Sequence, residues 1–178
     1  MKGEAWLRAE TPAIVRATLI EKPVVAAKLL KRAKSPVLVV GHEAAGGEGS
    51  GILDPIARIA KATGAPVVAT GGVSGVLGRK GLKDPLVLSA MEAGDRLLDP
   101  AWRPAPDRDP PDYAFILGVP FAIASVIEAG LASFARDHLK IVSLDRLYHP
   151  HCDLSLPNQS REEWEKNLEA IAREVEKT

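Results

Sequence analysis

Three short apolar runs, each stopped by a glycine, constrain the fold of this chain most. The runs cover residues 36–40, 66–70 and 113–117, and the glycines that follow them are Gly41, Gly71 and Gly118. Continuous apolar runs of this length are typical of parallel strands that are buried on both faces. Helical patterns lie between them, so the chain alternates strand and helix. This alternation predicts an α/β fold with an open, mostly parallel sheet and helices on both faces.

Helix-start signals support the same alternation. Asp54 is expected to cap the helix after the first run, with Pro55 at its first position and Gly64 at its end. Ser160 and Glu163 have the spacing of a capping box, which predicts the start of the last helix. Further helices are expected over residues 23–33, 86–98 and 120–134, and a fourth strand over residues 140–144.

The length fits a single domain. The chain has 178 residues, and we expect one domain over residues 1–178 with an N-terminal extension over about residues 1–22. The proline-rich, charged stretch 103–112 has no periodicity and leads directly into a strand. It is therefore expected to be a loop and not a domain boundary.

Charge and cysteine content exclude several classes of function. Lys and Arg together number 23, as do Asp and Glu, so no basic surface for nucleic acid or anionic membranes is expected. The single cysteine, Cys152, cannot supply the four thiolates of an iron–sulfur cluster. The N-terminus lacks the apolar core of a signal peptide, and the apolar stretch 115–134 is interrupted by polar residues and glycines. We therefore expect a cytoplasmic protein without a membrane span.

Candidate ligand-binding residues are those at the carboxyl ends of the strands, because open α/β sheets bind ligands there. They are Gly41, His42, Thr70, Gly71, Gly118 and Asp145. The glycine-rich loop 41–51 could cradle a nucleotide, but it matches neither known phosphate-loop spacing, and its spacing favours a flexible connection. Asp145 stands where Rossmann-like domains often place an acid near ribose, although an ion pair with Arg146 or a helix cap explains it equally well.

One cluster has the residue types of a metal site. It consists of His149, His151, Cys152 and Asp153. The spacing fits no structural zinc site, so a chance cluster in a surface loop is the better interpretation. The sequence shows no Ser-His-Asp or Cys-His arrangement, and we predict no catalytic residue and no metal ligand.

Two features of the sequence are compatible with a surface that binds another protein. The expected helix over residues 121–134 is apolar on several sides, which usually means burial within the domain and otherwise indicates a partner. Trp6 and Trp102 lie in irregular segments, where they either close an edge of the core or anchor another subunit.

Six stretches in order carry a family resemblance. They are residues 26–41, 66–71, 98–102, 112–118, 142–146 and 154–160. With these stretches the chain resembles the epsilon subunit of the archaeal acetyl-CoA decarbonylase/synthase complex over nearly its full length. It departs from the family at Val119–Ile123, where an aromatic and His- or Lys-bearing segment is usual, and in the longer first loop.

The resemblance implies a fold, a partner and a candidate cofactor. The fold would be Rossmann-like, similar to the NAD- or FAD-binding domain of deoxyhypusine synthase. The partner would be the alpha subunit that carries the nickel–iron–sulfur chemistry of carbon monoxide dehydrogenase, in an alpha2-epsilon2 assembly. The subunit would stabilise that assembly or assist electron transfer to FAD. A stand-alone module for FAD or another dinucleotide is the alternative, and an independent enzyme ranks last because no catalytic group is evident.

Overall fold

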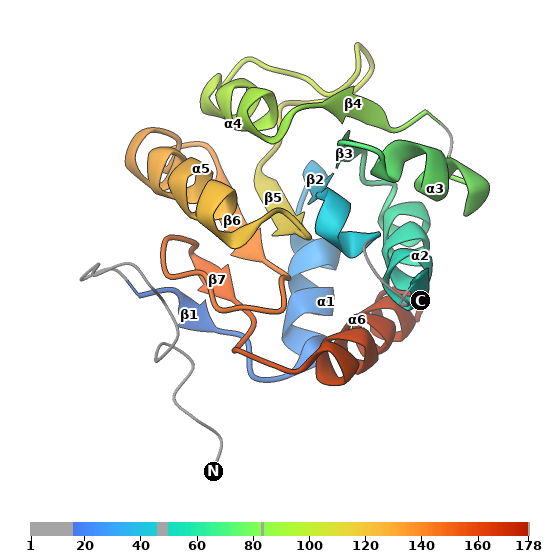
Figure 1. Cartoon of the computed structure of the whole chain (residues 1–178). Coiled ribbons are helices and arrows are strands. Elements are labelled where there is room, and N and C mark those ends of the chain that lie inside the picture. The colour runs from blue at the N-terminus through green and yellow to red at the C-terminus, as the bar shows by residue number, and fades with distance from the viewer. Residues whose placement is uncertain (1–15, 46–49, 83, 178) are drawn as a thin grey trace.

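The described part of the chain forms an open parallel sheet. The computed structural model describes residues 16–45, 50–82 and 84–177, and within these residues seven strands run in the order β1-β7-β6-β5-β2-β3-β4. Every pairing between neighbouring strands is parallel (Figure 1). The strands are β1 (Thr18–Leu19), β2 (Pro36–Val40), β3 (Val67–Thr70), β4 (Leu86–Leu88), β5 (Tyr113–Leu117), β6 (Lys140–Ser143) and β7 (Leu154–Ser155). The predicted α/β, Rossmann-like class is confirmed.

Helices cover both faces of this sheet, as the buried strands predicted. They are α1 (Pro23–Arg32), α2 (Leu53–Thr63), α3 (Val73–Arg79), α4 (Ala90–Leu98), α5 (Phe121–Phe134) and α6 (Arg161–Glu176). Successive strand side chains point to opposite faces. Leu38 and Leu117 thus join one core with α1, α2, α3 and α6, whereas Val39 and Ile116 join another with α4 and α5.

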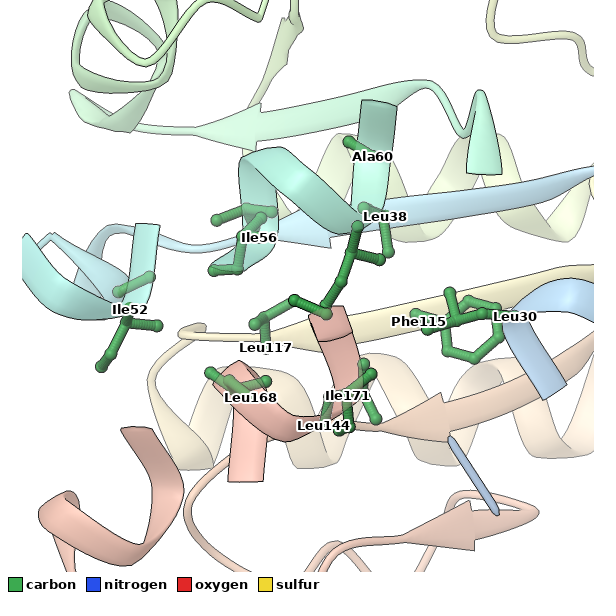
Figure 2. Packing of buried hydrophobic residues seen from close by; sticks show 14 of the residues in the cluster. Leu30, Leu38, Ile52, Ile56, Ala60, Phe115, Leu117, Leu144, Leu168 and Ile171 are labelled. Carbon is green, nitrogen blue, oxygen red and sulfur yellow. The ribbon is translucent and has the colours of Figure 1, made fainter. Parts of the chain in front are cut away.

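The larger core lies beneath α1, α2 and α6. In Figure 2, Ile56 of α2 and Leu168 and Ile171 of α6 converge on Leu38 and Leu117 of the central strands. All five side chains are almost completely buried. Burial of this kind contributes about 1.5–3 kcal/mol for each large aliphatic side chain.

The capping-box prediction is confirmed. The Ser160 side chain accepts a hydrogen bond from the backbone N–H of Glu163, and the Glu163 carboxylate accepts one from the backbone N–H of Ser160. Gly64 ends α2 in the left-handed conformation, with φ of 66°, as expected for a glycine C-cap.

The prediction of a continuous helix over 86–98 is wrong in its first turn. Residues Leu86–Leu88 form the edge strand β4, which pairs with β3, and the helix starts only after Ser89. The Ser89 hydroxyl accepts a hydrogen bond from the backbone N–H of Glu92, so Ser89 is the N-cap. A three-residue strand has too few positions for its period to be distinguished from that of a helix.

The predicted start of α2 is also wrong. A 3-10 turn (Ser50–Ile52) leads into the helix, which begins at Leu53, so Pro55 occupies its third position. Proline is tolerated there because the first N–H groups of a helix have no partner within it. The Asp54 carboxylate forms an ion pair with Lys80, with an N–O distance of 2.7 Å, and does not cap the helix.

The remaining expectations concern the edges of the fold. The described end of the predicted N-terminal extension contributes β1, which pairs with β7 and buries Ile20. Residues 103–112 contain no helix or strand, as the sequence predicted. Trp102 is half-buried and packs against the α4–α5 core, whereas Trp6 lies outside the described residues. Among the described helices, none is both long and apolar enough to cross a bilayer.

Strand order places the topological switch point between β2 and β5, and two glycines close it. The backbone N–H of Gly41 donates to the Leu117 carbonyl over 2.8 Å, and the N–H of Glu43 donates to the Gly118 carbonyl over 2.9 Å. A Cβ on Gly41 would lie 2.0 Å from the Gly118 oxygen. Gly118 itself has φ of 68°, a conformation that side chains disfavour. The two glycines are therefore required for the strand ends to meet.

Gly41→Ala should lower the free energy of unfolding by about 3 kcal/mol, because the new methyl group overlaps backbone atoms that cannot move aside. Gly75→Ala is the matched control, since a Cβ there meets nothing within 4 Å and the site lies inside α3. It should be neutral or stabilising by up to about 1 kcal/mol. Denaturant titration of both variants measures the difference, and equal stabilities would contradict the close contact.

Candidate functional site

The six predicted ligand-binding residues all lie at the carboxyl edge of the sheet, in two groups. Over β2 and β3, His42 is exposed and lies beside Gly71, whose added Cβ would be 3.5 Å from the His42 Cβ. Thr70 precedes Gly71 at the end of β3 and is buried. Over β2, β5 and β6, Gly41 and Gly118 lie together with Asp145.

Asp145 fixes the strand ends through backbone hydrogen bonds. Its carboxylate oxygens accept from the N–H groups of Gly118 and Arg146, each over 2.6 Å. Burial raises the pKa of the Asp145 carboxyl, while the charge of His149 and the two amides act in the opposite direction without cancelling the rise. Asp145 therefore bonds to Arg146, but through the backbone N–H group of Arg146.

A pocket opens beside Asp145, above β5 and β6. Its volume is about 280 Å³. Its lining residues come from the ends of β2, β5 and β6 and from the starts of α5 and α6: Glu43, Val119, Phe121, Asp145, Arg146, Leu147, His149, Arg161 and Trp164. Among the six predicted residues, Asp145 contributes to this lining. The pocket lies one strand away from the switch point because the Gly41–Gly118 contact fills the switch point itself.

His149, one of the lining residues, forms a buried acid–base pair with Glu128. His149 Nδ1 lies 2.7 Å from the Glu128 carboxylate, and both side chains are at most 1% exposed. The His149 backbone is held by its N–H donating to Ser155 Oγ, and its ring lies against Phe121 with ring centroids 4.9 Å apart. Burial lowers the pKa of His149, but the hydrogen bond and charge of Glu128, together with Asp145, raise it more. The pKa of His149 therefore lies above its ordinary value.

The expectation of a surface loop over His149–Asp153 is wrong for two of its members. His149 and Cys152 are buried, because the segment from β6 to β7 folds inward beneath α5. Burial and the nearby Glu128 carboxylate raise the pKa of the Cys152 thiol well above its ordinary value. Within the described residues, no group of three or more His, Cys, Asp or Glu side chains is arranged to hold a metal ion.

Sequence reasoning missed the Glu128–His149 pair. Glu128 is the single charged residue between Phe121 and Phe134, and it lies on the buried face of α5 with Ala124 and Leu131. A lone acid at a core position needs a partner, since an unpaired buried charge is costly. That signal was present in the sequence, but the partner lies 21 residues away and only the fold identifies it.

Comparison with known proteins gives a consistent result. Residues 7–175 match the profile of a family described as CO dehydrogenase beta subunit/acetyl-CoA synthase epsilon subunit. The chain is 28% identical over 153 residues to the acetyl-CoA decarbonylase/synthase complex subunit epsilon of Methanothermobacter thermautotrophicus, with 86% of each chain covered. It is 30% identical over 149 residues to subunit epsilon 1 of that complex from Methanosarcina barkeri, with 84% of each chain covered.

The Glu128–His149 pair should make stability depend on pH. Above the ordinary histidine pKa of 6.5 and up to the raised value, the folded protein binds more protons than the unfolded chain. The free energy of unfolding should therefore fall as pH rises through this window. Denaturant titrations at intervals from about pH 6 to 8 measure this slope, in a range below the thiol titration of Cys152.

The double variant Glu128→Gln/His149→Gln should flatten that slope, because neither side chain then titrates. His151→Gln, two residues away and half-buried, should retain it. A slope that survives in the double variant would assign the pH dependence to other groups.

Proposed function

The chain belongs to the CO dehydrogenase beta subunit/acetyl-CoA synthase epsilon subunit family, and we propose that it is a cytoplasmic, non-catalytic epsilon-type subunit of an acetyl-CoA decarbonylase/synthase complex. Its partner in this proposal is the alpha subunit that carries the nickel–iron–sulfur chemistry, and its role is to stabilise an alpha2-epsilon2 assembly. Two relatives that cover most of the chain are named as epsilon subunits of that complex, which supports the proposal.

The observation that carries this proposal is the outer face of α5. Phe134, Val126 and Ile123 are 80%, 64% and 42% exposed, and they recur at helical spacing along one side of the helix. The charged residue within α5, Glu128, is completely buried. A 14-residue helix therefore presents no charge to solvent over its length. Interfaces are depleted of charge at their centre and enriched in aromatic side chains.

The neighbouring helix α4 also exposes an apolar side chain. Met91 of α4 is exposed, and α4 packs directly against α5. The opposite side of the protein differs, because α2 and α6 carry an ion-pair network in which Arg58 contacts both Glu169 and Glu176. We therefore place the partner contact on the α4–α5 side of the sheet.

The cysteine content of the chain supports a role without metal chemistry of its own. One cysteine cannot hold a cluster that needs about four thiolates, so the iron–sulfur chemistry of the complex requires another chain. In this proposal the epsilon-type subunit supplies shape and contacts, and the alpha subunit supplies the reacting metals.

Co-expression with the alpha subunit from the same source under strict anoxia tests the proposal. Val126→Glu should abolish co-purification, because it places a charge at the centre of the apolar face. Val25→Glu is the matched control: Val25 is also exposed but lies on α1, on the other side of the sheet. Thermal unfolding should show both variants to be folded. Equal co-purification of the two variants would refute the α5 interface, and a wild-type chain that never associates would refute the subunit role.

A second candidate is a stand-alone module that binds FAD or another dinucleotide and serves electron transfer. The 280 Å³ pocket at the carboxyl edge, next to Asp145, favours it. Titration of the purified chain with FAD should then quench flavin fluorescence with a micromolar dissociation constant. Unchanged fluorescence at high micromolar FAD would eliminate this candidate and leave the subunit role intact.

A further inference from the structure

One glycine of α5 is not explained by the contacts of its own fold. Gly130 lies in the interior of this helix, where glycine is less favourable than every other residue except proline. A Cβ added at Gly130 would meet no atom of the described residues within 4 Å. Gly94 of α4 differs, because a Cβ there would lie 2.9 Å from Ile127 Cγ2, so the packing of α4 against α5 explains it. The fold itself therefore gives no reason for glycine at position 130.

Gly130 lies in the middle of the exposed face of α5. Residues four apart are one turn apart on the same side of a helix, so Val126, Gly130 and Phe134 form one row. Val126 and Phe134 are exposed apolar side chains, and Gly130 contributes no side chain between them. The space over Gly130, bounded by Val126 and Phe134, is named the Gly130 gap. Gaps between rows of side chains are the places where a second helix inserts its own side chains.

The charge pattern of α5 restricts what can cover this face. The charged residue within the helix, Glu128, is completely buried and paired with His149. The first turn of α5 contains no acidic residue and its last turn contains no basic residue. A charged side chain brought onto this face would lose its hydration without gaining an ion pair from α5. The covering element must therefore present uncharged residues to the helix.

We propose that an uncharged helix of the alpha subunit crosses α5 at Gly130 and places one large apolar side chain in the Gly130 gap. This inference rests on the proposed function, since membership in a family of complex subunits favours another subunit over a second copy of this chain as the occupant. A helix fits the face because rows of side chains on two helices interdigitate, and a glycine lets the two backbones come close. Gly130 is then a specificity-determining residue, because any side chain at this position would occupy the gap.

Gly130→Ala and Gly130→Leu test the gap with two sizes of side chain. Alanine and leucine both favour a helix more than glycine does, and the space over Gly130 is open in the chain alone. Both variants should therefore unfold at a higher denaturant concentration than the wild type. Association with the purified alpha subunit, measured by calorimetric titration under anoxia, should change in the opposite direction. It should weaken less for alanine and by about tenfold or more for leucine, because the larger side chain overfills the interface.

Gly75→Leu is the matched control. Gly75 lies within α3, on the other side of the sheet, and a Cβ there also meets nothing within 4 Å. This variant carries the same substitution in a helix outside the proposed interface, so it should bind the alpha subunit as the wild type does.

Each outcome decides the proposal. Weaker association of a Gly130→Leu variant that is at least as stable as the wild type supports it. Unchanged or stronger association of Gly130→Leu, when Val126→Glu abolishes association, would overturn the gap and leave the subunit role intact. A wild-type chain that never associates would refute the subunit role and the gap together.

Two further results would also overturn the proposal. Loss of stability in both Gly130 variants would show that this glycine serves the fold itself. Sedimentation of the isolated chain detects self-association, and a dimer that Gly130→Leu dissociates would identify a second copy of this chain as the occupant.

Discussion

The contact between Gly41 and Gly118 is the constraint on which the rest of the carboxyl edge depends. In an open α/β sheet the switch point between two central strands is where a crevice is expected. Here the backbone of Gly41 lies so close to Gly118 that no side chain fits at position 41. The Gly118 N–H then faces β6 and donates to Asp145. The open space is displaced to the next strand, where α5, α6 and the segment after β6 enclose the pocket.

Local signals were sufficient to predict the class of fold. Apolar runs stopped by glycine gave the central strands, and the Ser160–Glu163 spacing gave the start of α6, because both signals lie within a few residues. The errors fell where the local signal was short or ambiguous. β4 has three residues and lies at the edge of the sheet, so its alternation could not be separated from the helix that follows.

The candidate site was predictable only in part, since its interactions join distant segments. Asp145 was identified from its place after a strand, but its bond to Gly118 spans 27 residues. Gly41 and Gly118 were predicted as ligand-binding residues from their place after strands, but the close approach of their two backbones is visible only in the fold. Glu128, as a lone acid in an apolar helix, indicated that a partner was needed, but only the packing of α5 against the β6–β7 segment identifies His149 as that partner.

The helix α5 has two different faces, and its sequence shows how they differ. Its inner face carries Glu128 and Ser125 among alanine and leucine, which places a charge where His149 can meet it. Its outer face carries Val126 and Phe134, where a free-standing domain would gain solubility from charged residues. A helix whose acid is turned inward while its apolar residues are turned outward is poorly suited to solvent on that side. This arrangement suits a helix that is covered on both sides, by its own sheet on the inner side and by another subunit on the outer side. The pocket at its N-terminus and the proposed contact along its outer face then share one rigid element, so the position of α5 against the sheet matters to both.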